Sequence, residues 1–336
     1  GQNDRRPDRA VIVYANLIRR HFKNTRPIVL GGVEASLRRV AHYDYWSDSV
    51  RRSILFDAKA DILVYGMAER TVVDLAERLR AGQEIADLRG ICTIAREKPE
   101  GALELPSFEE VARDKRAFIE MFHTFYRNND PLTARTLCQQ QDTRYLVQNP
   151  PALPLSQTEL DAVYEIEYER AQHPYYEKHG PVRALETIRF SLTTHRGCYG
   201  ECNFCSIAVH QGRTVRWRSE DSIVREARRL VQLPDFKGII QDVGGPTANM
   251  YGFECGKKTT RGSCADKRCL YPEICPQMAV DHGRQRALLK RLRGLEGVKK
   301  VFVASGVRYD LVLADQKQGR AYLRDLVRHH TSGQMK

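Results

Sequence analysis

The second half of the chain alternates strands and helices in a fixed order, and this alternation constrains the fold more than any other feature. The expected strands and helices, in chain order, are a strand at 186–194, a helix capped by Ser219, a strand at 236–243, a helix at 286–295, a strand at 298–305 and a helix at 318–329. Such a run predicts a parallel sheet or barrel whose functional loops lie at the carboxyl ends of the strands.

The first hundred residues show a similar alternation. We expect helices at 9–23 and 69–80 and short apolar strands at 28–30 and 61–65. Each of these strands ends at glycine, the first at Gly31 and the second at Gly66, which suits a crevice at the strand ends of an open parallel sheet. This pattern predicts a Rossmann-like domain.

Between 97 and 182 the periodicity weakens and prolines recur. We therefore predict an α/β protein with three parts. They are an incomplete Rossmann-like domain at 1–100, a proline-punctuated connector at 101–183, and an incomplete barrel at 184–336 that carries a cysteine-rich insertion at 250–280.

The formal net charge is +12, and this favours anionic partners. The basic residues stand singly or in pairs, such as Arg51-Arg52 and Lys299-Lys300, so a solvated surface is the simpler interpretation. An RNA or phosphorylated substrate is allowed without being demanded. No apolar stretch of membrane-spanning length and no secretory signal is found, so we expect a cytoplasmic protein that does not enter a membrane.

Seven of the nine cysteines fall between Cys198 and Cys275, which indicates metal or redox chemistry rather than a disulfide scaffold. Three of them, Cys198, Cys202 and Cys205, lie within eight residues after a strand. Three thiolates can hold three irons of a cuboidal cluster and leave the fourth iron open to another ligand. The alternative is a zinc site or a buried cysteine cluster, but zinc sites usually have four ligands, arranged in pairs.

The spacing CxxxCxxC, with Phe204 directly before the third cysteine, resembles the signature of the radical S-adenosylmethionine (SAM) superfamily. The resemblance implies that the three cysteines bind a [4Fe-4S] cluster and that Phe204 lies beside the adenine of SAM. It also implies that reductive cleavage of SAM gives a 5'-deoxyadenosyl radical, and that the protein needs an electron donor such as flavodoxin or ferredoxin.

Glycines at the end of the second barrel strand stand where that superfamily receives the methionine amino group of SAM. Here they are Gly244 and Gly245, and Pro246 replaces the usual acidic residue. Ser305 and Arg308, after the third strand, are further candidates for cofactor contact, and Asp310 follows them.

Motifs along nearly the whole chain resemble the YgiQ-type family of radical SAM proteins. They are GGVEASLRRVAHYDYW (31–46), HRGCYGECNFC (195–205), HQGR (210–213), DVGGPTANMYG (242–252) and VKKVFVASGVRYD (298–310). Members of that family extend beyond both ends of this sequence, so we expect a fragment.

A second cysteine set, Cys255, Cys264, Cys269 and Cys275, lies inside the insertion. Four thiols could hold zinc or a second iron-sulfur cluster and help an irregular segment to fold. The alternative is a set of unligated or partly paired cysteines that cover the barrel mouth. Their spacing matches no diagnostic motif.

The N-terminal part also resembles the later half of a cobalamin-binding-like domain, through 28–32, 60–70 and helix 71–80. The histidine loop that grips cobalt is not in this sequence, so cobalamin stays open beside a domain without cofactor. The leading hypothesis is a radical SAM enzyme of unknown substrate. The alternatives are a metal-stabilised nucleic-acid-binding protein and, third, a simple electron carrier.

Overall fold

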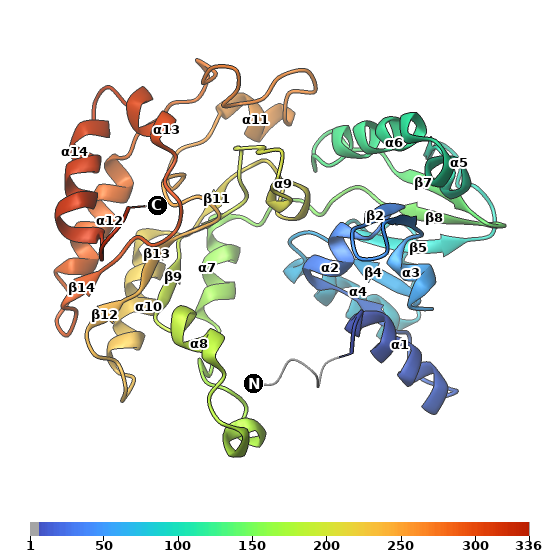
Figure 1. Ribbon diagram of the computed structural model, residues 1–336, viewed down its shortest axis with the longest axis horizontal. Helices are drawn as coiled ribbons and strands as arrows, with labels where there is room; N and C mark the ends of the chain where they lie inside the picture. Colours follow the sequence, from blue (N-terminus) through green and yellow to red (C-terminus); the bar gives the residue numbers. More distant parts are fainter. Residues whose placement is uncertain (1–6, 336) are drawn as a thin grey trace.

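The computed structural model describes residues 7–335 and shows two halves (Figure 1). The strands of the second half form separate two-stranded pairs. The first half has one six-stranded sheet. Its strands, in sheet order, are β1 (Val29–Leu30), β4 (Ile62–Val64), β5 (Ile91–Ala95), β8 (Arg144–Gln148), β7 (Leu137–Gln141) and β6 (Leu103–Leu105). The helices of this half are α1 (Ala10–His21), α2 (Gly32–Leu37), α3 (Ile54–Asp57), α4 (Glu69–Ala81), α5 (Phe108–Arg113) and α6 (Lys115–Arg127), and a hairpin joins β2 (His42–Asp44) to β3 (Ser49–Arg51).

This first sheet corrects the expectation of an open parallel sheet. The pair β1–β4 is parallel, as expected, and so is β6–β7, but the three pairs between β4 and β7 are antiparallel. The elements expected at 9–23, 28–30, 61–65 and 69–80 are confirmed as α1, β1, β4 and α4.

Residues 101–148 were expected to belong to a connector, but they supply three of the six strands and two helices. The strand β7 was overlooked because its sequence, LCQQQ, looks polar. Gln139 and Gln141 are fully buried, and their side-chain oxygens accept the main-chain N–H groups of Ala41 (2.9 Å) and Ser53 (3.0 Å). Hydrogen bonding of this kind lets a polar side chain occupy a core position that hydrophobic periodicity cannot detect.

The chain then crosses to the second half through α7 (Gln157–Glu165), a 3₁₀ helix at Pro174–His179 and α8 (Arg183–Ile188). Helix α8 occupies the start of the strand expected at 186–194, so β9 is shorter, at Ser191–Thr193. The rest of the expected alternation is present. Strand β13 (Asp242–Gly244) pairs in parallel with β9, and β12 (Ile239–Ile240) pairs in parallel with β14 (Lys300–Val301).

Helices cover the outer face of these parallel strands (Figure 1). They are α10 (Glu220–Val231), α12 (Gly283–Arg293), α13 (Tyr309–Ala314) and α14 (Gly319–Asp325), which continues into a π-helical turn at Leu326–His330. Ser219 caps α10 through its hydroxyl, which accepts the Ser222 N–H at 3.1 Å, a contact worth about 1 kcal/mol. The chain therefore forms one sector of a β/α barrel. Its carboxyl-end loops carry a short pair, β10 (His195–Arg196) with β11 (Arg216–Trp217), and the helices α9 (Ile207–His210) and α11 (Gly256–Arg261).

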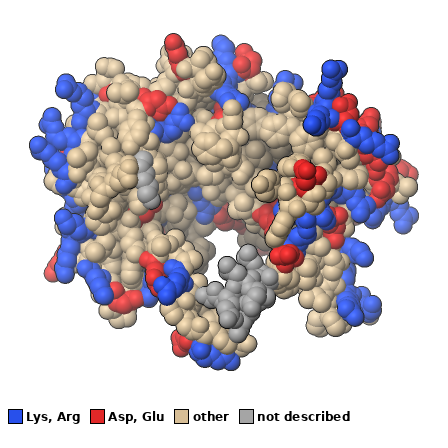
Figure 2. All heavy atoms as spheres, in the orientation of Figure 1, with Lys and Arg blue, Asp and Glu red and all other residues tan. Residues whose placement is uncertain are grey.

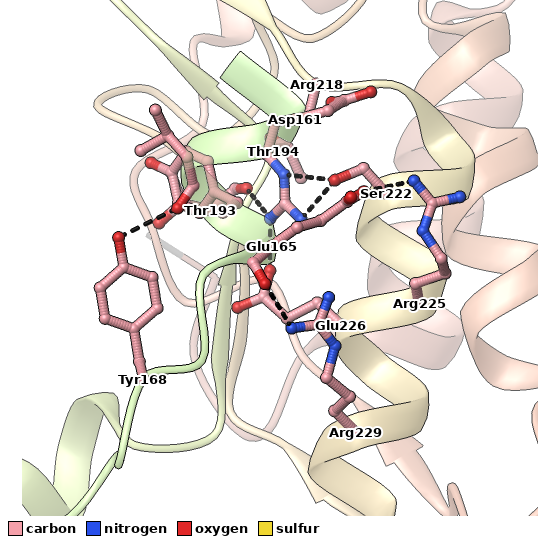
Figure 3. Close-up of polar contacts among 12 residues, drawn as sticks. Asp161, Glu165, Tyr168, Thr193, Thr194, Arg218, Ser222, Arg225, Glu226 and Arg229 are labelled. Atoms are coloured by element: carbon pink, nitrogen blue, oxygen red, sulfur yellow. Dashed lines mark hydrogen bonds and ion pairs between the residues drawn. The ribbon is translucent and has the colours of Figure 1, made fainter. Parts of the chain in front are cut away.

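A buried arginine fastens the first barrel strand to its covering helix. Arg218 is fully buried and donates to the Thr193 carbonyl (3.0 Å), to the Ser222 hydroxyl (2.9 Å) and to Glu226. Figure 3 shows the Arg218 guanidinium between β9 and α10. Arg170 also pairs with Glu226, whereas Glu226 is the carboxylate that pairs with Arg218, so removal of Glu226 would leave a buried charge unpaired, at a cost of about 3–5 kcal/mol. The strand that leads into the cysteine motif is thus held firmly.

Within residues 7–335, no helix is both long and apolar enough to cross a membrane.

Candidate functional site: a thiol loop at the carboxyl ends of the parallel strands

The cysteine motif forms a loop that starts where β10 ends. Gly197 has a left-handed backbone (φ 82°), and a Cβ there would lie 2.2 Å from the Thr214 carbonyl oxygen, so only glycine fits. The HQGR segment braces the loop from outside. The Cys198 N–H donates to the Gly212 carbonyl (3.2 Å), and the Gly197 N–H donates to the Gln211 side chain (3.0 Å). The structure therefore gives HQGR a place beside the loop that its spacing did not reveal.

The first thiol is buried among polar groups that can donate to sulfur. The Gly200 N–H lies 3.4 Å from Cys198 Sγ, and the Thr247 hydroxyl oxygen lies 3.5 Å from it. Burial raises the pKa of the Cys198 thiol. Donors around a sulfur stabilise it once it is deprotonated or bound to iron.

The Cys202 thiol lies near the Cys198 thiol, and both are close to Gly200. The sulfur atoms of Cys198 and Cys202 would stand 3.3 Å and 3.6 Å from a Cβ placed on Gly200, so they face one space above that glycine. Arg308 Nη1 donates to Cys202 Sγ at 3.5 Å. Cys202 and Cys205 are both partly exposed and join in a tight turn, in which the Cys205 N–H donates to the Cys202 carbonyl at 3.0 Å.

In the part of the chain that the structure describes, no three His, Cys, Asp or Glu side chains converge closely enough to hold one metal ion. A zinc ion needs its ligands on one centre, with Zn–S distances of about 2.3 Å. A cuboidal cluster instead takes each thiolate on a separate iron, so its ligands stand apart around a larger body. The donor set of Cys198, Cys202 and Cys205, with an amide and a guanidinium directed at two of the sulfurs, is of a chemical kind that can hold an iron-sulfur cluster.

The glycine turn lies beside this loop because β13 is the parallel neighbour of β9. A Cβ on Gly245 would stand 2.7 Å from the ring of His195, which fixes glycine at that position. A Cβ on Gly244 would stand 3.2 Å from Ser305 Oγ, so the third strand also reaches this point. The Gly244 carbonyl already accepts the main-chain N–H of Thr194 at 2.7 Å.

The polar residues after β14 are drawn into the same site. The Ser305 hydroxyl donates to Asp242, whose other carboxylate oxygen accepts the main-chain N–H groups of Ala304 (2.8 Å) and Ser305 (3.2 Å). Arg308 forms a two-pronged pair with Asp310, through Nε at 3.0 Å and through Nη2. Asp242 was not predicted as a site residue. Along the chain it is the carboxylate nearest to Pro246, which stands where the superfamily usually has an acidic residue.

Phe204 stands apart from these residues. Its side chain is 92% exposed, so a contact with adenine remains a prediction. The second cysteine set lies on the neighbouring insertion, where Cys255 belongs to the same apolar cluster as Cys198, with Cys269 and Cys275 packed against it. Lys257 and Lys258 each place Nζ 3.9 Å from a thiol, that of Cys264 and that of Cys269 respectively. Zinc or a second cluster there also remains a prediction.

A cavity of about 970 Å³ opens next to the glycine turn, between the two halves. Its wall combines strand ends of both halves. Among its lining residues are Gly31, Gly66 and Glu69 from the first half and Arg196, Asp242, Gly245 and Ser305 from the second. Arg196 forms an ion pair with Glu69 across the boundary between the two halves. Its Nε also donates to the Tyr164 hydroxyl at 2.9 Å. The space is large enough for a sizeable organic ligand.

Basic side chains are distributed widely over the face of the molecule that Figure 2 shows. Lys and Arg side chains are spread along the edges of both halves in Figure 2, with acidic side chains among them and no single basic patch. This distribution agrees with the interpretation of the net charge as solvated surface on that face.

A family model described as "Radical SAM N-terminal" matches residues 1–191. This chain belongs to the radical SAM family. UPF0313 protein FN0734 of Fusobacterium nucleatum is 54% identical over 337 residues, which cover 100% of this chain and 59% of that protein. A UPF0313 protein of Methanocella arvoryzae is 53% identical and covers 98% of this chain and 55% of its own length. The predicted membership in the YgiQ-type radical SAM family is confirmed.

The chain spans a little over half the length of these relatives. Among solved structures, the radical S-adenosylmethionine methyltransferase TsrM of Kitasatospora setae, with tryptophan and a SAM analogue bound, aligns with 17% identity and a TM-score of 0.42. That alignment covers 90% of this chain and 41% of TsrM.

Proposed function

We propose that this chain is the cofactor-binding part of a radical SAM enzyme, in which Cys198, Cys202 and Cys205 hold a [4Fe-4S] cluster. When bound, such a cluster supplies the electron that cleaves SAM to methionine and a 5'-deoxyadenosyl radical, which acts on a substrate not identified by this chain. The observation that carries the proposal is the meeting of the thiol loop with the glycine turn. Thr247, directly after that turn, lies 3.5 Å from Cys198 Sγ.

The chain's own residues prepare this site in three ways. Gly244 and Gly245 leave backbone space beside the loop, because a side chain at Gly245 would collide with His195. Arg308 brings a positive charge to Cys202. The pair of Arg196 with Glu69 ties the start of the loop to the first half and so closes one side of the cavity.

The proposal is tested by anaerobic reconstitution of the chain with iron and sulfide. We expect about four irons per chain, an electron paramagnetic resonance (EPR) signal after reduction, and 5'-deoxyadenosine when dithionite and SAM are added. Cys198→Ser should lose all three. Cys138→Ser, which changes a buried cysteine of β7, is the matched control and should retain the iron. Equal iron in the two variants would reject the cluster assignment.

The nucleic-acid alternative makes the opposite prediction. It requires a zinc-containing protein without a brown colour and an affinity for RNA that falls steeply with salt. Filter binding of RNA at two salt concentrations, together with metal analysis, separates the two functions.

A further inference from the structure

A line of buried polar side chains runs from the outer helices of the barrel sector to the thiol loop. It consists of Asp315 at the end of α13, His282 before α12, and Asn249 after the glycine turn, and it ends at Arg308. Asn249 and His282 are fully buried and Asp315 is 5% exposed. The mechanism above uses none of the three buried members.

Asn249 grips both main-chain groups of Arg308. Its Oδ1 accepts the Arg308 N–H at 2.7 Å, and its Nδ2 donates to the Arg308 carbonyl at 2.9 Å. A side-chain amide thus takes the place of a neighbouring strand at the point where β14 has ended and α13 has not begun. Without it the Arg308 N–H would lose its partner, at a cost of about 1–3 kcal/mol if it stays buried, and the Arg308 carbonyl would keep the longer bond from the Val312 N–H at 3.4 Å.

His282 supports the orientation of the Asn249 amide that the Arg308 main chain requires. Because Asn249 Oδ1 must accept from Arg308, its Nδ2 is the donor, and His282 Nε2, 3.1 Å away, must be the acceptor. The ring proton therefore sits on Nδ1, which donates to Asp315 Oδ2 at 2.8 Å. Asp315 Oδ2 also accepts the main-chain N–H of His282 at 2.9 Å, so the ring is held from two sides.

Aromatic packing leaves the imidazole little room to turn. Tyr322 stacks on it with ring centroids 4.5 Å apart and an interplanar angle of 24°. Phe253 meets it edge-on at 5.7 Å. The orientation of the Asn249 amide is therefore set by a rigid chain of contacts that reaches back to α13.

The other end of the line is the Arg308 guanidinium. Asp310 holds its Nε and Nη2, which leaves Nη1 to point at Cys202 Sγ, 3.5 Å away. A hydrogen-bond donor or a positive charge beside a cluster ligand is one of the means by which proteins set a cluster's reduction potential. The potential would then depend on where the backbone of Arg308 is fixed.

We propose that Asn249 is a positioning residue that holds Arg308 against the cluster ligand Cys202, and that the His282–Asp315 pair locks the Asn249 amide in the orientation this requires. This inference rests on the proposed function, since it concerns the cluster that the three cysteines would hold. It adds residues whose partners lie 33 and 59 positions away in the sequence.

The test is the midpoint potential of the reconstituted cluster, followed by EPR during a redox titration. Arg308→Gln removes the charge and defines the full shift, which is a fall in potential because a positive charge favours the reduced form. Asn249→Ala should produce the larger part of that same fall, and His282→Gln a smaller fall in the same direction. If Asn249→Ala does not fold, His282→Gln provides the same test.

Gln285→Ala is the matched control. Gln285 is also fully buried and donates to a main-chain oxygen, that of Ala248 at 2.6 Å, but within residues 7–335 it has no hydrogen bond to Arg308. Its potential should equal that of the wild type even though its stability falls. The proposal is overturned if Gln285→Ala shifts the potential as much as Asn249→Ala does, or if Asn249→Ala and His282→Gln leave it unchanged while Arg308→Gln lowers it. A wild-type chain that takes up no cluster rejects the proposed function itself, which is a different result.

Discussion

The two cysteine sets lie against one apolar cluster, yet the chain holds them in different ways. The first set is contacted by donors from its own loop and from the neighbouring strand ends, including the Gly200 amide and the Arg308 guanidinium. The second set lies in an insertion where the structure shows no helix or strand between Arg261 and Gly283. Of its thiols, those of Cys264 and Cys269 have a hydrogen-bond donor nearby, the ammonium groups of exposed Lys257 and buried Lys258, each at 3.9 Å. A cysteine motif is therefore surrounded by ordered hydrogen-bond donors where neighbouring strands fix its backbone.

Replacement of all the cysteines of one set at a time tests most directly whether the two sets differ in metal binding. Conversion of all three cysteines of the first set to serine should remove all cluster iron and all 5'-deoxyadenosine formation, because no protein ligand remains. Conversion of all four cysteines of the second set should leave the iron of the first set in place. Metal analysis of both variants provides the measurement. If the fourfold variant also loses zinc or iron, the second set holds metal as well, and unchanged metal content sinks the second site.

The insertion depends on one buried lysine, and its removal should have the next largest effect. Lys258 is 4% exposed, donates to the Arg213 carbonyl at 2.7 Å and pairs with the equally buried Glu254 at 2.8 Å. Lys258→Met leaves the Glu254 carboxylate buried without its counter-charge, which should lower the free energy of unfolding by about 3–5 kcal/mol. Urea unfolding of the chain measures this loss.

The neighbouring lysine is the control for that experiment. Lys257 is exposed, so Lys257→Met should change the free energy of unfolding by no more than about 0.5 kcal/mol. Equal effects of the two substitutions would show that the buried ion pair does not stabilise the insertion.

A buried histidine directly before the Cys198–Cys205 loop should make the folding stability depend on pH. His195 is fully buried, and burial lowers its pKa to about 4. In the unfolded chain a histidine titrates near 6.5, so the unfolded state binds the extra proton first as the pH falls. Folding stability is therefore intact above pH 6.5 and is lost progressively between pH 6.5 and 4, by about 3 kcal/mol at most.

Urea unfolding at several pH values tests this dependence, as the difference between the wild type and His195→Gln. That difference should shrink as the pH falls towards 4, because the glutamine does not titrate. His123→Gln, which changes an exposed histidine of α6, should leave the pH profile as it is in the wild type. A His195→Gln profile parallel to that of the wild type would contradict the prediction.

The same contrast explains which parts of the molecule the sequence could predict. The three-thiol loop, the glycine turn and the parallel strands were predictable because their signals are local spacings and periodicities. Asn249 and His282 were missed as functional residues, although Asn249 stands inside a motif of the family, because a buried hydrogen bond between distant residues leaves no periodic trace. The strand β7 was missed for the same reason, since its buried glutamines are paired with backbone far away in the sequence.

Alanine substitution of one glycine beside each cysteine set should give the smallest changes in stability and iron content. A Cβ on Gly200 would stand 3.3 Å from Cys198 Sγ and 3.6 Å from Cys202 Sγ, whereas a Cβ on Gly256, at the start of α11, would meet nothing within 4 Å. Neither glycine has a left-handed backbone, so alanine adds no backbone strain at either position. Gly256→Ala should raise the free energy of unfolding by about 0.5 kcal/mol, because it restricts the unfolded chain. Gly200→Ala should forgo that gain and lower the iron content after reconstitution, since its methyl group occupies the space between the two thiols. If Gly200→Ala takes up as much iron as Gly256→Ala, the space above Gly200 is not where the thiols hold their cluster.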